Sequence, residues 1–218
     1  KLKKKKIFVG QHSLRSGLQD YDVYFDYSKS ISNYFLTWGW KNESKSIIPY
    51  SSKRIFSSIK KYKKVEDKDN IVLSFCFILS SYSKNGECLY DNFIENSKAE
   101  KARINLLKII KKYKKFKIIL KPREGSFLSD KNNFFYKKFK ISKRKTRMYE
   151  IFGNYNVLIF ERISLGIVES IYLNQPVIFY YPKFLYKQKS KKYNELLSLL
   201  KKANICFDDK KKCMQLLN

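Results

Sequence analysis

The pattern of hydrophobic and polar positions predicts a regular order of strands and helices after residue 70. Residues 71–80 and 156–160 are short and almost wholly apolar, which is typical of strands covered on both faces of a parallel sheet. Residues 98–115 repeat apolar side chains every three or four positions, with lysines between them, and this spacing predicts an amphipathic helix. Shorter runs of the same kinds predict strands at 116–120, 177–181 and 205–207, and helices at 165–173, 194–203 and 210–217.

The alternation of strands and helices predicts the fold class, which is α/β with a Rossmann-like parallel sheet and flanking helices. Ligands of such sheets bind at the carboxyl ends of the strands, so functional residues are expected there. The first part of the chain is less regular: it opens with a strand at 7–10 and is rich in aromatic residues. Residues 51–70 have the composition of a connector with one short helix. We therefore expect two domains, at residues 1–64 and 65–218.

The composition is strongly basic, because 47 Lys and Arg residues stand against 19 Asp and Glu residues in a chain of 218, a net charge of +28. Such a charge makes a nucleic-acid-binding protein one candidate class. The lysines are spread over the whole sequence, however, and Lys, Asn, Ile, Phe and Tyr are abundant together, as AT-rich codon usage produces. We expect a solvated basic surface that attracts anions, whether nucleotides, anionic glycans or an anionic membrane.

Several protein classes are excluded by simple counts. A hydrophobic content of 44% is too high for a disordered chain, and no run reaches the ~18 apolar residues of a membrane span. The GxGxxG, GxxxxGK[ST] and GxSxG motifs are absent from the sequence. The basic start has no apolar signal-peptide core, and we expect the chain to be a piece of a longer protein. The cysteines form no CxxC pair and predict buried, reduced thiols in the cytoplasm, without a metal site: Cys76, Cys88, Cys206 and Cys213.

The clearest candidate site lies between residues 156 and 181. Ser164, Leu165 and Gly166 follow a predicted strand and begin a predicted helix. The N–H groups at such a helix start bind diphosphate, with Ser164 as N-cap and Gly166 allowing a ligand to approach closely. The carboxylate of Glu169 would accept hydrogen bonds from two sugar hydroxyls. The alternative interpretation is an ordinary capped helix whose Glu169 faces solvent.

This order of strand, Ser-x-Gly, Glu and a following Pro-Val-Ile resembles the nucleotide-sugar site of glycosyltransferases with the two-domain GT-B fold. A second set of short matches, spread over nearly the whole chain, is similar to a family of transferases from surface-polysaccharide (lipopolysaccharide and O-antigen) gene clusters. These matches are Gln11-His12, Asp26, Ile31-Ser32-Asn33, Trp38-Gly39-Trp40, Lys121-Pro122-Arg123 and Tyr181-Pro182-Lys183.

The resemblance implies a metal-independent transferase that moves a sugar or a related group from a nucleotide-activated donor to a surface polysaccharide. The acceptor would be a glycan or a lipid-linked chain, and no cofactor is implied besides the donor. Residues 1–64 would be the remnant of an acceptor-side domain, and residues 65–218 the domain that binds the donor. The expected location is the cytoplasm, with peripheral contact at the inner face of the membrane.

Individual residues take roles from the same resemblance. His12, the single histidine of the chain, would take the proton from the acceptor hydroxyl. Lys121 and Arg123, at the end of a strand, would neutralise the departing diphosphate. Weaker candidates are Gln11 and Asp26 on the acceptor side and Lys183 near a phosphate. For Trp38 and Trp40 we expect core packing rather than stacking on a sugar.

Two other functions stay open. A basic nucleic-acid-binding protein would use scattered lysines together with Tyr and Phe for stacking, although no specific nucleic acid is expected. A degenerate, non-catalytic relative would only bind a glycan or a partner, and the altered loop Ser13–Ser16 is its main support. Ser13 replaces the glycine that follows Gln-His in the family, and Asn33 replaces an aspartate.

Overall fold

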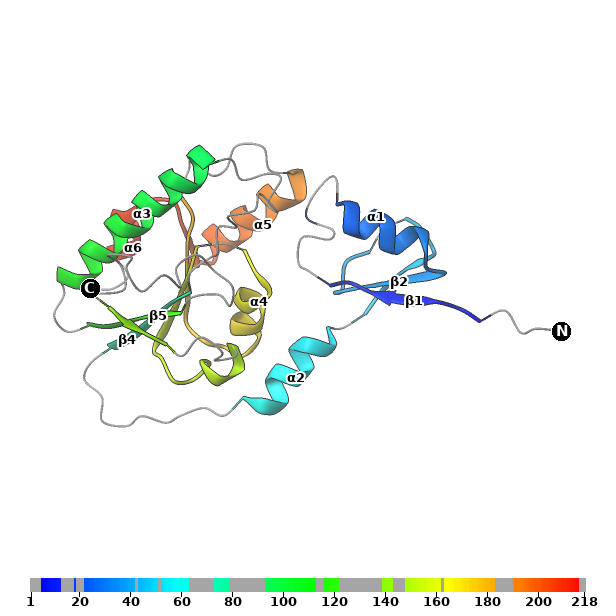
Figure 1. Ribbon diagram of the computed structural model, residues 1–218, viewed down its shortest axis with the longest axis horizontal. Coiled ribbons are helices and arrows are strands. Elements are labelled where there is room, and N and C mark those ends of the chain that lie inside the picture. The colour runs from blue at the N-terminus through cyan, green and yellow to red at the C-terminus, as the bar shows by residue number, and fades with distance from the viewer. Residues whose placement is uncertain are drawn as a thin grey trace. The chain divides into compact units, whose positions relative to one another are not determined.

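In the computed structural model the chain divides into two compact units, and Figure 1 labels the main helices and several of the strands. Unit 1 comprises Lys1–Lys61 and Gln188–Ser198, and unit 2 comprises Tyr62–Lys187 and Leu199–Asn218. The residues that the structure describes are 5–12, 18, 22–41, 43–50, 52–62, 73–78, 93–112, 116–121, 139–142, 148–161, 163–182 and 190–215.

The chain returns to unit 1 late in the sequence, where helix α5 (Lys191–Lys202) begins. The hydroxyl of Ser190 donates a hydrogen bond to the backbone oxygen of Leu18. The Nζ atom of Lys192 lies 5.8 Å from the centre of the Trp40 ring, within the range of a cation–π contact. Unit 1 is therefore built from two stretches that lie far apart in sequence.

Unit 1 contains a small parallel sheet with strands in the order β1-β2-β3. Its elements follow in the order β1 (Phe8–Gly10), α1 (Val23–Ser30), β2 (Tyr34–Thr37), β3 (Ile47–Pro49) and α2 (Lys53–Lys61). The sequence predicts β1 and a helix in the connector, but it does not predict α1, β2 or β3.

Helix α1 begins at a polar cap and packs on one face of this sheet through an aromatic side chain. The carboxylate of Asp22 accepts hydrogen bonds from the N–H groups of Tyr24 and Phe25, at 3.1 and 3.3 Å, which satisfies donors that the helix start leaves open. The Phe25 ring meets the rings of Phe35 and Trp40 edge to face, with centroids 4.9 and 5.6 Å apart. One face of the sheet is thereby covered.

Unit 2 contains a six-stranded parallel sheet in the order β6-β5-β4-β7-β8-β9. Its strands are β4 (Leu73–Ile78), β5 (Phe116–Lys121), β6 (Lys140–Ile141), β7 (Val157–Phe160), β8 (Val177–Tyr180) and β9 (Cys206–Phe207). The chain starts in the middle with β4, moves outward through β5 and β6, and then returns to pair β7 with the other side of β4. The direction of strand addition therefore reverses between β4 and β7, and in doubly wound sheets such a reversal marks the ligand-binding crevice.

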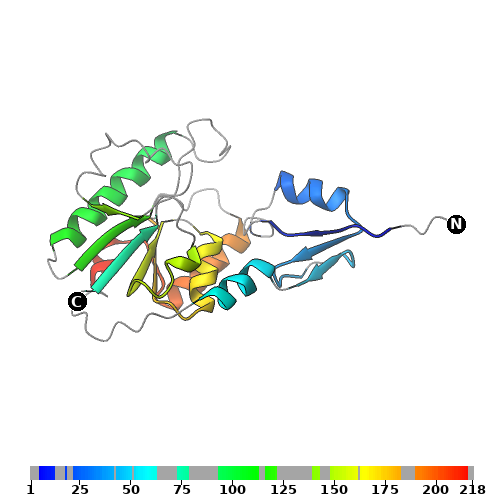
Figure 2. The ribbon, with the colours of Figure 1, turned by 60° about the horizontal axis from the view of Figure 1, so that its bottom comes forward.

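Helices lie on both faces of this sheet, as Figures 1 and 2 show for α3 (Phe93–Lys112) on one side and α4 (Leu165–Tyr172) on the other. The core under α3 and α6 (Lys210–Gln215) comprises Leu106, Leu107, Ile110, Leu120, Ile159, Ile178, Tyr180, Phe207 and Cys213. Leu158 and Phe160 alternate with Ile159 along β7 and are also buried, beneath α4. Because both faces are covered, β7 has no polar alternation.

The α/β class with parallel strands and helices is confirmed, and nearly all the elements predicted after residue 70 lie within a few residues of their predicted positions. The largest difference is α3, which begins at Phe93 rather than at residue 98. The short strand β6 and the 3₁₀ turn Met148–Glu150 are not predicted by the sequence. None of the described helices combines the length and the hydropathy that crossing a bilayer requires.

Cys213 of α6 and Tyr180 of β8 are buried in one core cluster, and their ionisation makes the stability of unit 2 depend on pH in the alkaline range. Burial raises the pKa of the Cys213 thiol from 9.0 to about 12. Burial, together with the nearby Cys213 and Asp209, raises the pKa of Tyr180 from 10.0 to about 12. Both groups ionise at lower pH in the unfolded chain than in the folded protein. Their contribution to the free energy of unfolding is therefore fully present below about pH 9 and is lost as the pH rises.

We therefore expect the free energy of unfolding to fall as the pH rises from about 9 to about 12. Urea unfolding at several pH values between about 8 and 11 measures this slope, and Cys213→Ala should make it shallower. An identical slope in the variant and the wild type would contradict the prediction. The cysteines Cys206 and Cys213 are buried thiols, as expected, whereas Cys88 and the side chain of Cys76 lie outside the described residues.

Candidate active site

The start of helix α4 lies at the carboxyl edge of the six-stranded sheet, next to the point where the strand order reverses. Strand β7 ends at Phe160, and the helix begins at Leu165. Ser164 occupies the N-cap position with an extended backbone, as predicted, but its side chain does not cap the helix. In the first turn of α4 the N–H of Ile167 donates to the Ser164 backbone oxygen at 3.1 Å. Helix starts in general leave other N–H groups without a carbonyl partner, and such groups are suited to bind an anion.

Gly166 is explained by packing inside unit 2. A Cβ atom on this residue would lie 3.0 Å from Cε1 of Phe160 and 3.3 Å from Cε of Met148. The missing side chain therefore faces the end of β7, and glycine lets the helix start approach the sheet closely. The sequence-based expectation that Gly166 admits a ligand stays a prediction, and this packing gives the glycine a second reason.

Glu169 lies on the inner face of α4 and is only 1% exposed. The interpretation that this carboxylate faces solvent is therefore wrong. Leu165, Gly166 and Ser170 are buried on the same side of the helix, and the Ser170 hydroxyl donates to the backbone oxygen of Gly166 at 2.6 Å. Burying a carboxylate is costly, so an acidic residue at this position calls for a specific polar role.

Lys121 is the last residue of β5 and is 7% exposed. In the sheet register it pairs with Ile78 of β4, which in turn pairs with Phe160 of β7. Lys121 and Phe160 thus lie at the same level, two strands or about 10 Å apart. Because Leu120 packs under α3, the alternation along β5 directs Lys121 toward the opposite face, which α4 covers. The structure brings Lys121 and the start of α4 to one face and one edge of the sheet.

A buried ion pair beside this edge is missed by sequence reasoning. Nε and Nη2 of Arg103 in α3 lie 2.6 and 2.7 Å from the two carboxylate oxygens of Glu161, a bidentate arrangement. The Arg103 side chain is 1% exposed and that of Glu161 is 9% exposed. Glu161 directly follows β7 and begins the segment that leads to α4, so the pair holds this segment against α3. The sequence feature that could have revealed this pair is the position of Arg103 among the apolar residues of an amphipathic helix.

Unit 1 carries the second group of predicted residues, at the end of β1. Gln11 is buried, and its Oε1 atom accepts hydrogen bonds from the backbone N–H of Trp38 and from Nε1 of Trp40, both at 2.8 Å. Gln11 therefore holds the Trp38-Gly39-Trp40 turn. The Trp40 ring is partly buried and meets the ring of Phe25. His12, the next residue, is exposed.

The remaining predicted residues are less informative. Asp26 is exposed in the first turn of α1, where a carboxylate also complements the helix dipole. Arg123, Lys183 and the loop at 13–17 lie outside the described residues. Across the described part of the chain, no cluster of three or more His, Cys, Asp or Glu side chains is placed to hold a metal ion. The candidate residues thus form two groups, with His12 and Gln11 in unit 1 and Lys121, Ser164, Leu165, Gly166 and Glu169 in unit 2.

The whole chain, residues 1–218, matches the model of a family described as LIC12162 family transferase. No curated protein matches the chain, and no solved structure matches it.

Proposed function

The chain belongs to the LIC12162 family of transferases, and from this premise we propose that it moves a sugar or a related group from a nucleotide-activated donor to a surface-polysaccharide acceptor. In this proposal unit 2 is the donor-binding domain of a GT-B-like fold. The observation that carries the proposal is the helix start of α4 at the strand-order reversal, with buried Glu169 in the helix. Doubly wound sheets bind nucleotides at this place.

Each group at the donor edge has a distinct task. The first N–H groups of α4 and the ammonium of Lys121 stabilise the negative charge of the diphosphate. The Glu169 carboxylate accepts hydrogen bonds from paired hydroxyls of the ribose or the sugar. In this scheme the helix dipole and basic side chains supply the positive charge that the leaving group needs.

His12 acts on the acceptor. Its imidazole takes the proton from an acceptor hydroxyl while the hydroxyl oxygen forms the new bond to the transferred carbon. The bond between that carbon and the diphosphate oxygen breaks, and the diphosphate leaves with the electron pair. The acceptor is a glycan or a lipid-linked chain, which a protein of charge +28 would meet at an anionic membrane surface.

We expect one nucleotide among UDP, CDP, GDP and CMP to raise the melting temperature of the protein, because a ligand that binds only the folded state stabilises it. Glu169→Gln keeps the size of the side chain but removes its charge, and it should lower the affinity for that nucleotide by about tenfold or more. Thermal-shift titration measures both effects. Glu195→Gln, on an exposed position of α5, is the matched control and should leave the affinity unchanged.

The same titration tests the competing functions. Stabilisation by a single-stranded oligonucleotide alone, lost at high salt, would replace this proposal with basic nucleic-acid binding. If none of the four nucleotides shifts the melting temperature, the donor site is refuted.

A further inference from the structure

The three parallel strands of unit 1 end at one edge, and a side chain suited to binding follows each strand. His12 lies two residues beyond β1, Trp38 directly follows β2, and Tyr50 directly follows β3. The strand registers pair Gly10 with Leu36 and Thr37 with Pro49. Continuing these registers sets His12 beside Trp38, and Trp38 beside Tyr50. We call His12, Trp38 and Tyr50 the edge row.

Hydrogen bonds beyond the strand ends hold these positions. The N–H of Gln11 donates to the Leu36 backbone oxygen at 2.8 Å, which continues the ladder between β1 and β2. The N–H of Tyr50 donates to the Thr37 backbone oxygen at 2.9 Å, which continues the ladder between β2 and β3. The N–H of Trp38 donates a hydrogen bond to Oε1 of the Gln11 side chain. The backbone of the edge row is therefore anchored at all three strands.

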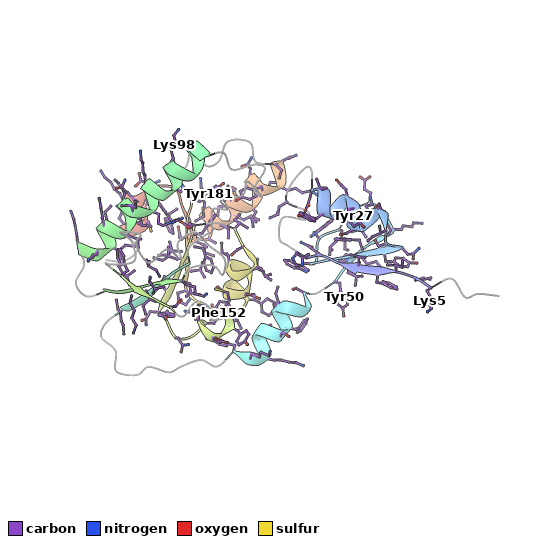
Figure 3. The ribbon with its side chains drawn as sticks, in the orientation of Figure 1. Lys5, Tyr27, Tyr50, Lys98, Phe152 and Tyr181 are labelled. Atoms are coloured by element: carbon purple, nitrogen blue, oxygen red, sulfur yellow. The ribbon has the colours of Figure 1, made fainter. Side chains whose placement is uncertain are left out.

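The edge row lies on the face of the sheet opposite to α1. Gln11, Phe35 and Thr37 are buried on the face that α1 covers, and side chains alternate between the two faces along each strand. The edge row falls on the other face, where Tyr50 is 57% exposed, His12 is exposed and Trp38 is half-buried. Figure 3 shows Tyr50 extending on the side of unit 1 away from α1. Adjacent strands are about 4.8 Å apart, so the row is about 10 Å long.

The two tryptophans of the turn take different places. The Trp40 side chain lies on the α1 face, against Phe25 and hydrogen-bonded to Gln11. Gly39 between them has a φ of +95°, a conformation that favours glycine and allows the chain to reverse. The backbone oxygen of Trp40 accepts from Oγ1 of Thr37 at 2.5 Å, which fixes the turn. Trp38 is thereby left at the edge, with its neighbour packed inside.

We propose that the edge row is a subsite for a sugar ring of the acceptor. The faces of Trp38 and Tyr50 offer flat apolar surface to the C–H groups of a sugar, while the tyrosine hydroxyl and the imidazole form hydrogen bonds with its hydroxyls. His12 at the end of the row is then beside a bound hydroxyl. The inference rests on the proposed function, which makes this sugar the acceptor, and it differs from the expectation that Trp38 packs in the core.

The sequence provides a direct reporter, because Trp38 and Trp40 are its only two tryptophans. We would titrate the wild type, Trp40→Phe and Trp38→Phe with maltotetraose, chitotetraose and a decathymidylate oligonucleotide, and record tryptophan fluorescence. We expect an oligosaccharide to change the emission of the wild type and of Trp40→Phe in a saturable way, with no change in Trp38→Phe. Tyr50→Ala should weaken this binding about tenfold, by the loss of one stacked ring.

Tyr24→Ala is the matched control, because Tyr24 is 84% exposed on α1 and lies outside the edge row. It should bind the oligosaccharide as the wild type does. If no oligosaccharide changes the emission at concentrations up to about 10 mM, or if the signal survives in Trp38→Phe, the edge row is not a sugar subsite. Binding of the oligonucleotide alone at Trp38 would also overturn it. Nucleotide thermal shifts are measured separately, so failure of the donor site and failure of the edge row give different results.

Discussion

Replacing Glu161 by alanine is expected to lower the free energy of unfolding of unit 2 by about 3–5 kcal/mol. The substitution removes the carboxylate that lies 2.6 and 2.7 Å from Arg103, while the guanidinium stays buried. A buried charge without its counter-ion has lost its hydration, and no other interaction compensates for that loss. A typical domain has only about 5–15 kcal/mol of stability, so the variant should melt at a clearly lower temperature.

A second ion pair in the same unit provides the control. Nζ of Lys201 lies 3.0 Å from Asp208, but the lysine side chain is 39% exposed. Asp208→Ala should therefore cost no more than about 1 kcal/mol in urea unfolding. Equal losses for Glu161→Ala and Asp208→Ala would contradict the prediction. The double variant Arg103→Met with Glu161→Leu should recover much of the loss, because it leaves no charge in the buried site.

Replacing His12 by asparagine is expected to lower kcat by roughly 10²–10⁴-fold, the usual contribution of a positioned base. Asparagine keeps a polar side chain of similar reach but cannot take the proton from the acceptor hydroxyl. The measurement is release of the nucleotide from the sugar nucleotide whose nucleotide gives the thermal shift, in the presence of the acceptor saccharide. Affinity for the nucleotide alone should not change, because the proposed donor residues lie in unit 2. An unchanged kcat would remove His12 from the mechanism.

The sequence predicts unit 2 far better than unit 1, and burial explains the difference. Strands such as β7 are covered on both faces, and α3 has a distinct apolar face, so both produce a strong hydrophobic pattern. Helix α1 has no buried residue, and Val23, Tyr24 and Tyr27 are exposed, so its sequence has no stripe that marks a helix packed on a core. The strands β2 and β3 are too short for alternation to be read.

The candidate site is predictable where the residues adjoin a strand end. Lys121 is a candidate for this reason, whereas Glu169 is a candidate from its place in the helix that follows β7, and both side chains are buried. Arg103 is not found, since it stands among many basic residues and its partner is 58 positions away. The structural role of Gln11 is also hidden, because its contacts with Trp38 and Trp40 depend on how β1 and β2 pair. Pairing over such distances is a property of the fold and cannot be read from one sequence.

The return of the chain to unit 1 has a consequence for synthesis on the ribosome. Residues 1–61 emerge first, but the contacts of Ser190 with Leu18 and of Lys192 with Trp40 become available only when most of the chain has been translated. Contacts of such high sequence separation slow folding, because a long loop must close before they form. We therefore expect the N-terminal part to complete its packing only after the segment that begins at Ser190 has been translated.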